Sequence, residues 1–581
     1  MSIIKKVEEI IKNHIKNAGY EVEKVILVPS SRKELGEYQV NNSFQLAKVY
    51  HANPMEIANK IKEELEKDSN FKDVNVAGGF VNISFSDSFY LENINKVLED
   101  INNNIDKEEK KKIFMDYGGA NIAKTLHVGH LRPADIGEAV KRLAVKLGYD
   151  VISDVHFGDI GRQSGMVIYE IRERFPDLNY FKDDFDGEGD PLPITVDDLQ
   201  DIYPIATTKA KENEEIMEEV HRITNELENG NKAYVSLWNK IKALSIEDIK
   251  GIYDILNTTF DLYEGEIECY PYIPELIDIL KDKNLLYESE GAMVVDVKEE
   301  TDTEPMPPLV ILKGNGGTVY QTRDLATILS RMKRFNPDEI WYFTDNRQEL
   351  YFKQVFRVAK KAGIVNPDTE LKFFGFGSMN GPDGKPFKTR DGGVMSLHEL
   401  IKMVKEITRS KISVDLVAEE NRAKTSEQIA IAALKYADLL PDRSKDFIFD
   451  VNKFADLDGK TGPYLLYSTV RINSLLEKAE VDTNNLKVKL IPDEETFKDV
   501  LKLILEMPTV LTKVLLDKSL NGISDYLYRL TSSYNRFYAT NHILTCENND
   551  LKESYLALSK LIYNINKLLL DILAIEVPEK M

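Results

Sequence analysis

The stretch "ANIAKTLHVGHLR" carries residues whose types and spacing suit the binding of a nucleoside triphosphate. His127 and His130 lie three residues apart around Gly129, and Lys124 precedes them. A helix predicted from about Leu131 to Leu147 follows directly, and the N-terminus of a helix favours phosphate. The two histidines would point to the same side of the first turn, while the glycine leaves room for a flat group. The stretch therefore predicts a nucleotide site.

Two other interpretations of the histidine pair are a pair packed in the core and a pair of metal ligands. An H-x-x-H spacing without a third ligand nearby is weak as a metal site. Cys269 and Cys546 lie far apart and form no metal-ligand pattern. The acidic stretch "DDFDGEGDPLPI" has Thr195 where a calcium loop needs glutamate, so it predicts a surface loop. We expect no tightly bound metal.

A second basic loop, "MNGPDGKPFKTRDGGVMSL", lies at residues 379–397. It is rich in glycine and carries the cations Lys385, Lys388 and Arg390. Such a loop suits a departing pyrophosphate, whose negative charge grows in the transition state. A solvated surface turn is the plain alternative.

Both loops follow predicted strands, which are the elements that must position them. "KIFMDYG", the helix after the histidines and "YDVISDVHFGD" form a strand–helix–strand unit, which implies a parallel sheet. Further strands are predicted in "EGAMVVDV", "PLVILKG", "DEIWYFTD" and "LKFFGFGS". A parallel sheet binds ligands at the carboxyl ends of its strands, where both loops would lie.

The chain divides into four predicted parts. Residues 1–108 form a small α/β unit that begins with an amphipathic helix and includes "VEKVILVPS" and "VNVAGGFVNISFS" as strands, with loop and helices between them. A charged run at 102–112 is interpreted as a linker. Residues 109–400 form the parallel-sheet core, interrupted at about 166–262 by a charged helical insertion. Residues 401–455 are connecting helices, and residues 456–581 form a helical bundle.

Composition is that of an ordinary globular protein, with 43% hydrophobic and 30% charged residues among 581. No apolar run is long enough to cross a membrane, and we expect a cytoplasmic chain that acts as a monomer. The net charge of −22 weighs against a nucleic-acid partner, because phosphate contacts need lysine and arginine. Local patches can still bind RNA, so an RNA partner stays open.

A family likeness runs through the whole chain. "HVGH" resembles the H-I-G-H signature of class I aminoacyl-tRNA synthetases, and "KPFKT" occupies the place of their K-M-S-K-S loop. More narrowly, the chain resembles the arginyl-tRNA synthetase family. The segments that carry this resemblance, in family order, are "GEYQVNNSFQLAK", "GGFVNI", "ANIAKTLHVGHLR", "HFGDIGRQSG", "ESEGAMVVDV", "GGTVYQTRDLA", "DNRQELYFKQVF", "DGKPFKTRDGG", "TGPYLLYSTVRI" and "VPEKM".

The resemblance implies an α/β fold: a Rossmann-type catalytic core, an N-terminal α+β domain that binds tRNA and a C-terminal all-α domain that binds the anticodon. It implies that arginine and ATP, with magnesium, form arginyl-adenylate, and that arginine then passes to the terminal ribose of its tRNA. The residues that would contact ATP are Lys124, His127, Gly129, His130, Asp159, Gln163, Lys385 and Lys388. Those that would act in catalysis are Lys124, His127, His130, Lys385 and Lys388.

A guanidinium needs carboxylates placed for bidentate hydrogen bonds, because its donors form a rigid planar fork. By the resemblance, Glu266 and Asp324 would hold that fork beside Tyr320, while His127 would lie between arginine and the α-phosphate. The residues that would hold the amino-acid end are Asp116, Asn121 and Gln348. Surface placement for Glu266 and helix capping for Asp324 are the structural alternatives.

The resemblance also implies contacts with tRNA, for which fewer residues of this sequence are candidates. Asn41 and Phe44 are candidates for reading a tRNA-loop base by hydrogen bonding and stacking. Candidates for anticodon contacts in the last domain are Tyr464, Tyr467, Arg471 and Met581. Such helical aromatic or apolar positions also suit a protein core.

The sequence departs from the family pattern at several positions. Pro386 and Phe387 stand where the broad loop signature has Met and Ser, and Ile160 stands where tryptophan is usual. None of these removes a charge that the chemistry needs. Two alternatives are another ligase or nucleotidyltransferase with the same histidine motif and a catalytically silent RNA-binding relative. The first would not need Glu266 and Asp324 together, and the second would be expected to lose the histidines or loop lysines.

Overall fold

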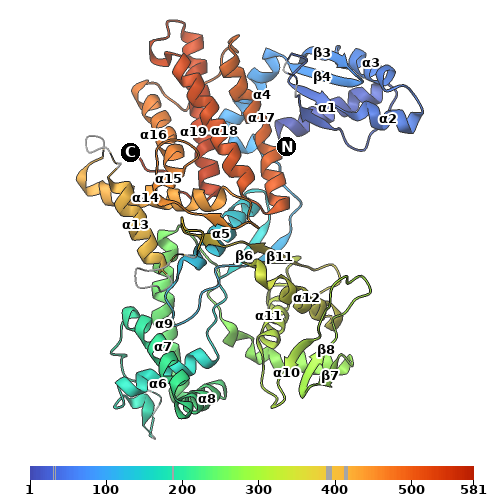
Figure 1. The fold of residues 1–581 in the computed structure, drawn as a ribbon. Coiled ribbons are helices and arrows are strands. Elements are labelled where there is room, and N and C mark those ends of the chain that lie inside the picture. The colour runs from blue at the N-terminus through green and yellow to red at the C-terminus, as the bar shows by residue number, and fades with distance from the viewer. Residues whose placement is uncertain are drawn as a thin grey trace.

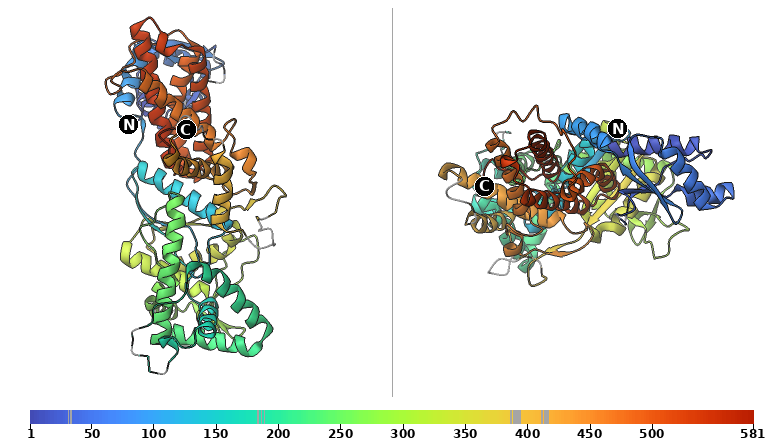
Figure 2. Two further views of the ribbon diagram at one scale, coloured as in Figure 1. Left: turned by 90° about the vertical axis from the view of Figure 1, so that its left-hand side faces the viewer. Right: turned by 90° about the horizontal axis from the view of Figure 1, so that it is seen from above.

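The computed structural model of the chain is elongated, with a parallel sheet near its middle (Figures 1 and 2). It describes residues 1–581 except 31, 33, 183, 186, 188, 386, 388–394, 411 and 413–416. The C-terminal helices form a bundle at one end, and the N-terminal unit projects sideways beside that bundle. The helical insertion lies at the opposite end. Across the described ranges, no helix is long and apolar enough to cross a membrane.

The N-terminal unit is an antiparallel sheet packed against helices. Its strands, in spatial order, are β1 (Leu27–Pro29), β2 (Tyr38–Val40), β4 (Phe80–Phe85) and β3 (Phe71–Ala77). Its helices are α1 (Ile3–Asn17), α2 (Asn42–Tyr50), α3 (Pro54–Leu65), α4 (Asp87–Glu99) and the 3-10 turn η1 (Ile101–Asn104). The predicted N-terminal helix is confirmed, and Gly78 and Gly79, both with positive φ, form the turn between β3 and β4.

Two details of this unit differ from the sequence prediction. Strand β2 lies where loop and helices were expected. Its three residues are too few to show an alternation of apolar and polar side chains, and the strand forms by pairing with β1 and β4. The segment interpreted as a linker is partly buried: Asp106 accepts hydrogen bonds from the Ser2 N–H at 2.7 Å and from its hydroxyl at 2.8 Å. The Asn104 amide donates to the carbonyl of Ile504 at 2.8 Å. This segment therefore ties the N-terminal unit to the bundle.

Four parallel strands form the central sheet, and their order creates the ligand position. In spatial order they are β11 (Glu370–Phe376), β10 (Glu339–Asp345), β5 (Lys112–Asp116) and β6 (Asp150–Asp154). Helix α5 (Leu131–Lys146) connects β5 to β6 as predicted, and α12 (Glu349–Ala362) connects β10 to β11. The chain winds to opposite sides from β5 and from β10, so the carboxyl ends of these two strands flank a crevice.

Two of the predicted strands belong to a different sheet. "EGAMVVDV" and "PLVILKG" supply β8 (Ala292–Val295) and β9 (Leu309–Leu312), which pair antiparallel with β7 (Leu286–Ser289). Short apolar runs predict strands but not partners, which explains why the sequence did not separate the two sheets. Helices α10 (Ile273–Asp282) and α11 (Tyr320–Phe335) flank this small sheet, and η4 (Glu266–Tyr272) precedes α10.

The remaining elements are almost all helical. The insertion contains α6 (Arg162–Arg174), η3 (Asn179–Phe181), α7 (Val196–Glu212), α8 (Glu214–Glu228) and α9 (Lys232–Ile255). The C-terminal part contains α13 (Leu397–Arg409), α14 (Glu419–Leu439), α15 (Val451–Phe454), α16 (Gly462–Lys478), α17 (Glu495–Asp517), α18 (Asn521–Thr540), η6 (Ile543–Thr545) and α19 (Asn549–Ile572). A short parallel pair, β12 (Met379–Asn380) and β13 (Phe447–Ile448), joins the core to these helices.

Helix α5, which carries the histidine motif at its start, is fixed to α14 by two buried ion pairs. Arg132 Nε lies 2.7 Å from an Asp438 carboxylate oxygen, and Lys435 Nζ lies 3.0 Å from an oxygen of Asp135. None of these four side chains is more than 2% exposed. Arg132 also donates to the carbonyl of Gly377 at 2.6 Å, just after β11. The contacts fix the start of α5 relative to the end of the sheet.

We expect Lys435→Met to lower the free energy of unfolding of the core by about 3–5 kcal/mol, because it leaves the Asp135 carboxylate buried without its cation. Urea unfolding followed by tryptophan fluorescence measures this. Lys424→Met is the matched control on the same helix, because Lys424 pairs with Glu576 at 3.8 Å in an exposed position. Equal effects of the two substitutions would show that the buried pair has no special role.

Candidate active site

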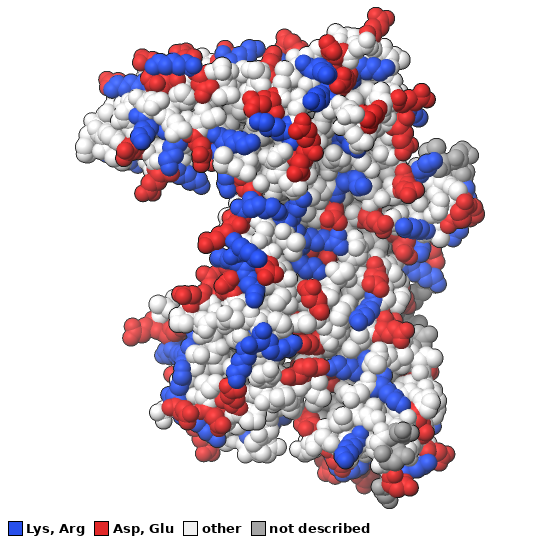
Figure 3. All heavy atoms as spheres, turned by 180° about the vertical axis from the view of Figure 1, so that it is seen from behind, with Lys and Arg blue, Asp and Glu red and all other residues white. Residues whose placement is uncertain are grey.

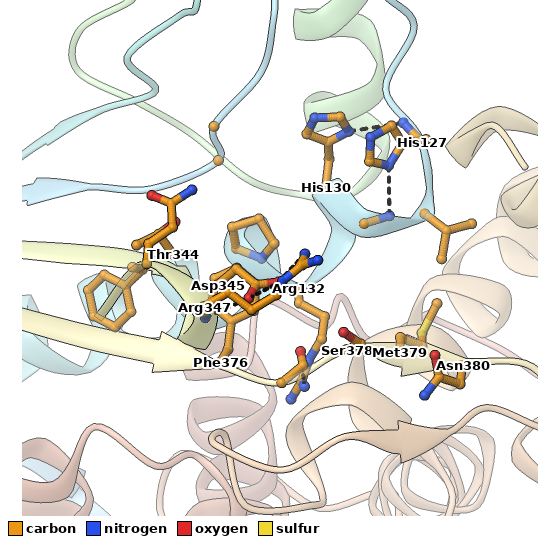
Figure 4. A pocket seen from close by; sticks show the side chains of 18 of the residues that line it. His127, His130, Arg132, Thr344, Asp345, Arg347, Phe376, Ser378, Met379 and Asn380 are labelled. Carbon is orange, nitrogen blue, oxygen red and sulfur yellow. Dashed lines mark hydrogen bonds and ion pairs between the residues drawn. The ribbon is translucent and has the colours of Figure 1, made fainter. Parts of the chain in front are cut away.

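A cavity of about 450 Å³ opens at the carboxyl ends of β5 and β10. Its walls come from three places: the glycines after β5, the histidine motif, and the ends of β10 and β11 (Figure 4). The lining includes Gly118, Gly119, His127, Gly129, His130, Thr344, Asp345, Gln348, Phe376 and Ser378. Its volume lies within the usual range for small-molecule sites. The cavity therefore lies where the sheet order and the motif both place a nucleotide.

The two histidines hold each other in place. The His127 backbone N–H donates to His130 Nδ1 at 3.0 Å, and the Gly129 N–H donates to His127 Nδ1 at 3.1 Å (Figure 4). The ring centroids lie 4.0 Å apart. A Cβ atom on Gly129 would lie 2.9 Å from His127 Cε1, so a larger residue there would push the ring aside. His127 is exposed at the cavity, while His130 is 8% exposed beneath it.

Desolvation favours the neutral form of both imidazoles, most strongly for His130. Desolvation, followed by repulsion from His127, lowers the pKa of His130 to about 3. Partial desolvation, and then the nearby Lys124, also lowers the pKa of His127. Neutral imidazoles can donate one hydrogen bond each to a phosphate oxygen without requiring a proton from solution.

This lowered pKa predicts a pH-dependent stability. The unfolded state binds more protons than the folded state between the ordinary histidine pKa of 6.5 and about 3, so stability falls as pH falls through that window. From pH 7 to pH 5 the expected loss from His130 is about 2 kcal/mol. We expect His130→Asn to show a correspondingly smaller loss in urea unfolding at the two pH values. Parallel losses in both proteins would contradict the buried neutral imidazole.

Each acidic residue predicted to bind arginine forms an ion pair or a hydrogen bond with another side chain of this chain. Asp116 lies 2.7 Å from Arg331 Nη2, and Glu266 Oε2 lies 2.6 Å from Arg323 Nε. The remaining contact is between Asp324 and Tyr351, whose hydroxyl donates to the Asp324 carboxylate. The Arg323 guanidinium also stacks 4.6 Å from the ring centroid of Tyr320, which is 65% exposed.

Burial raises the pKa of Asp324 and also of Glu266. For Glu266, the nearby Arg323 opposes that effect, and for Asp324 the hydrogen bond from Tyr351 does so. An incoming guanidinium would stabilise the ionised form of either carboxylate. The structure therefore brings Asp116, Glu266, Asp324 and Tyr320 into one acidic group, while His127 and Gln348 line the adjacent cavity.

Other predicted residues are not among those that line the cavity. Lys124 Nζ lies 4.4 Å from the Tyr203 ring centroid, and Asp159 pairs with Lys242 at 2.6 Å. The Gln163 amide donates to the carbonyl of Ile122. Asn121 packs against Gly158, whose added Cβ would lie 2.3 Å from the Asn121 Oδ1. Lys385 is exposed in its loop, and Lys388 lies outside the described residues.

The candidate RNA contacts differ in accessibility. Phe44 is 37% exposed and Tyr467 is 41% exposed. Arg471 donates to Asn535 at 2.6 Å, and the Asn535 amide donates to the Tyr464 hydroxyl at 2.8 Å. Met581 is 8% exposed and belongs to the hydrophobic core. Asn41 precedes α2, and its Oδ1 is buried with no hydrogen-bond partner among the residues described.

Several residues of the site were not predicted from sequence. Thr344 and Asp345 end β10 and line the cavity, and the rule that ligands lie at strand ends was signal enough to find them. No local sequence pattern indicates that Arg323 and Arg331 belong to the site. Their partners Glu266 and Asp116 lie far away in the chain, and only the fold brings them together.

Family models match three successive parts of the chain. The model described as "tRNA synthetases class I (R), catalytic domain" matches residues 93–451. The "Arginyl tRNA synthetase N terminal domain" matches residues 5–85, and the "DALR anticodon binding domain" matches residues 465–581. The three matches cover the N-terminal unit, the sheet core with its insertion, and the helical bundle.

Similar proteins match over the full length. The chain is 40% identical to an arginine–tRNA ligase of Alkaliphilus oremlandii, covering 100% of both chains. It is 42% identical to one of Agathobacter rectalis, covering 99% of this chain and 98% of the other. Solved structures of arginyl-tRNA synthetases from Plasmodium falciparum (24% identity) and Thermus thermophilus (18%) share the fold, each with a TM-score of 0.80 over 100% of both chains. This chain belongs to the arginyl-tRNA synthetase family.

Proposed function

We propose that this chain is an arginine–tRNA ligase, which activates arginine with ATP and transfers it to the terminal ribose of arginine tRNA. The observation that carries the proposal is the cavity beside the neutral His127–His130 pair, next to an acidic group suited to a guanidinium. The full-length likeness to arginine–tRNA ligases supports the same assignment.

In the first step, an oxygen of the arginine carboxylate attacks the α-phosphorus of ATP. A new P–O bond forms, the bond to the bridging oxygen breaks, and pyrophosphate leaves with that electron pair. No general base is required, because the attacking carboxylate is already ionised. His127 and His130 would donate hydrogen bonds to phosphate oxygens as their charge develops, and Gly129 would leave space for the adenosine.

Lysines complete the proposed phosphate site. Lys124, Lys385 and Lys388 would neutralise the departing pyrophosphate, and Asp159 and Gln163 would support the loop on the other side of the nucleotide. Lys385 is exposed and has freedom to approach a bound nucleotide. Lys124 would have to leave the Tyr203 ring. ATP would enter as its magnesium complex, with phosphate and water oxygens as the main ligands.

Arginine would lie between the cavity and the acidic group. Asp324 and Glu266 would receive the guanidinium beside Tyr320, as two carboxylates suit its planar fork. Asp116, Asn121 and Gln348 would hold the amino-acid end, with His127 between the carboxylate and ATP.

In the second step, a ribose hydroxyl of the tRNA attacks the carbonyl carbon of arginyl-adenylate, and AMP leaves. Despite the net charge of −22, Lys and Arg side chains gather around the concave waist beneath the N-terminal unit (Figure 3). Such a local patch suits an RNA backbone. Asn41 and Phe44 would contact a tRNA loop, and Tyr464, Tyr467 and Arg471 the anticodon, as candidates for base contacts.

We propose further that the protein works as a monomer in the cytoplasm. Light scattering of the purified chain should then give 66.3 kDa. The reaction itself is tested by charging total tRNA with each labelled amino acid in turn. We expect charging with arginine only. Charging with a neutral amino acid would favour another ligase of the same class, whereas tRNA binding without any charging would favour a silent relative.

A further inference from the structure

The acidic group next to the cavity has a definite balance of charge. Asp154, which contacts Arg331 as Asp116 does, extends the group to four carboxylates, and three cationic or basic side chains lie among them, at the ends of β5 and β6, in η4 and in α11. The acids are Asp116, Asp154, Glu266 and Asp324, and the basic side chains are His156, Arg323 and Arg331. Asp159, which also faces Glu266, pairs with Lys242 at 2.6 Å, and the second partner of Lys242, Glu268 at 2.8 Å, is 40% exposed to water.

The Arg331 guanidinium forms ion pairs with two of these carboxylates. Its Nη2 lies 2.7 Å from an Asp116 oxygen and 3.0 Å from an Asp154 oxygen, and its side chain is 3% exposed. Asp154 is 1% exposed, so water cannot compensate its charge. One guanidinium for two carboxylates, of which Asp154 is fully buried and Asp116 partly buried, leaves a negative charge that a second cation would neutralise.

His156 is placed to be that cation. Its Nδ1 lies 3.5 Å from Asp154 Oδ2, and its backbone N–H donates to Asp154 Oδ1 at 3.2 Å. Its φ of 40° is in the left-handed region, which costs conformational energy for a residue with a side chain. Both ring nitrogens are buried and have no hydrogen-bond partner among the described residues. The fold therefore holds this ring in the acidic group despite the conformational cost.

The electrostatic environment of His156 supports a protonated ring. Burial by itself would lower its pKa and Arg331 opposes its charge, but Asp154 and Asp116 outweigh both and raise the pKa to about 9. The ring is then charged at neutral pH, and Glu266 and Asp324 are the other acids within its reach.

We propose that His156 is a positioning residue that sets the charge of the arginine pocket, so that a single incoming guanidinium completes its neutralisation. His156 and Arg331 together neutralise Asp154 and Asp116, and Arg323 neutralises Glu266. Asp324 is left with the Tyr351 hydroxyl, which carries no charge. The inference rests on the proposed function, because it assumes that this group receives arginine.

This charge balance would favour arginine over neutral amino acids. A bound arginine brings an ammonium and a carboxylate that offset each other, and a guanidinium that offsets Asp324. A neutral amino acid would leave a buried carboxylate without its counter-charge. Without the His156 charge, the acids would have one more unmatched negative charge and would take up a proton. Asp324 is the natural acceptor, because burial and Asp116 already favour its protonated form.

The test compares the wild-type chain with His156→Gln, which removes the charge, and His156→Lys, which keeps it. In the charging reaction at pH 7, we expect His156→Gln to raise the KM for arginine about 10- to 100-fold, with the KM for ATP unchanged. Above pH 7 this KM should fall by up to tenfold per pH unit, because arginine must displace a proton. Calorimetry of arginine binding in buffers of different ionisation enthalpy should show release of about one proton for His156→Gln and none for wild type or His156→Lys.

His14→Gln is the matched control, because His14 forms a similar histidine–aspartate pair with Asp68 at 2.9 Å in the N-terminal unit. It should leave the KM for arginine unchanged. If His156→Gln does not fold, the ¹⁵N signals of the wild-type His156 ring give the answer: protonation persisting to about pH 9 supports the proposal, and titration near 6.5 overturns it. Wild-type charging with an unchanged KM and no proton release in folded His156→Gln would also overturn it. Absence of wild-type charging would instead reject the proposed function.

Discussion

Asp324→Asn is expected to lower kcat/KM for arginine by about 30- to 5,000-fold, corresponding to about 2–5 kcal/mol for a buried charge pair that loses one partner. The asparagine has the same shape but offers one acceptor and no charge, so the guanidinium would lose its counter-ion. Most of the loss should appear in KM for arginine, since the reacting atoms are at the other end of the substrate. Steady-state charging kinetics with varied arginine measure it.

Tyr351→Phe is the matched control for that experiment. It removes the hydroxyl that donates to Asp324 but leaves the carboxylate charged. We expect a smaller loss than in Asp324→Asn, because Asp324 keeps its charge and loses one hydrogen bond, which to a charged group contributes about 1.5–3 kcal/mol. Unchanged arginine dependence in Asp324→Asn would remove this residue from the arginine pocket. The likeness to the family would still stand, but the specificity would have to reside elsewhere.

His127→Asn should reduce kcat for arginine activation by about 10²–10³-fold, with smaller changes in KM for arginine and ATP. The proposed imidazole N–H donates where negative charge develops on the α-phosphate, so its effect belongs to the transition state. Asparagine keeps an acceptor for the Gly129 N–H, which His127 Nδ1 now receives at 3.1 Å, so the local turn should persist. Single-turnover formation of arginyl-adenylate separates this step from tRNA transfer.

His398→Asn provides the control for His127→Asn. His398 is an exposed histidine on α13, and its replacement should leave both steps unchanged. An effect of His127→Asn confined to KM for ATP would mean that the side chain contributes to ground-state binding only. It would then be a nucleotide contact without a catalytic role.

The pattern of apolar and polar residues predicted the helices and strands whose formation depends on neighbouring residues in the sequence. Helix α5 ends one residue before its predicted limit, and β5, β6, β10 and β11 form where apolar runs indicated strands. The prediction of a parallel sheet then placed the histidine motif at the strand ends. The cavity lies there. This success rests on the short, repetitive geometry of strand–helix–strand units.

Long-range pairing was the part that sequence could not supply. Nothing near Glu266 indicates that Arg323 contacts it, and nothing near Arg132 indicates Asp438. The pairing of β8 and β9 with β7 instead of the central sheet is a similar case. The phosphate-loop assignment rests on the glycines and cations of the loop and on the resemblance, and Lys388 lies outside the described residues. Its role stays a prediction.

The most direct test of the central claim, that this site joins arginine to ATP, is exchange of labelled pyrophosphate into ATP. The assay is run with each amino acid, with and without arginine tRNA. We expect exchange with arginine only, and a requirement for tRNA would show that RNA completes the site. No exchange under either condition, from folded protein that still binds the tRNA, would contradict the account and identify a catalytically silent RNA-binding protein.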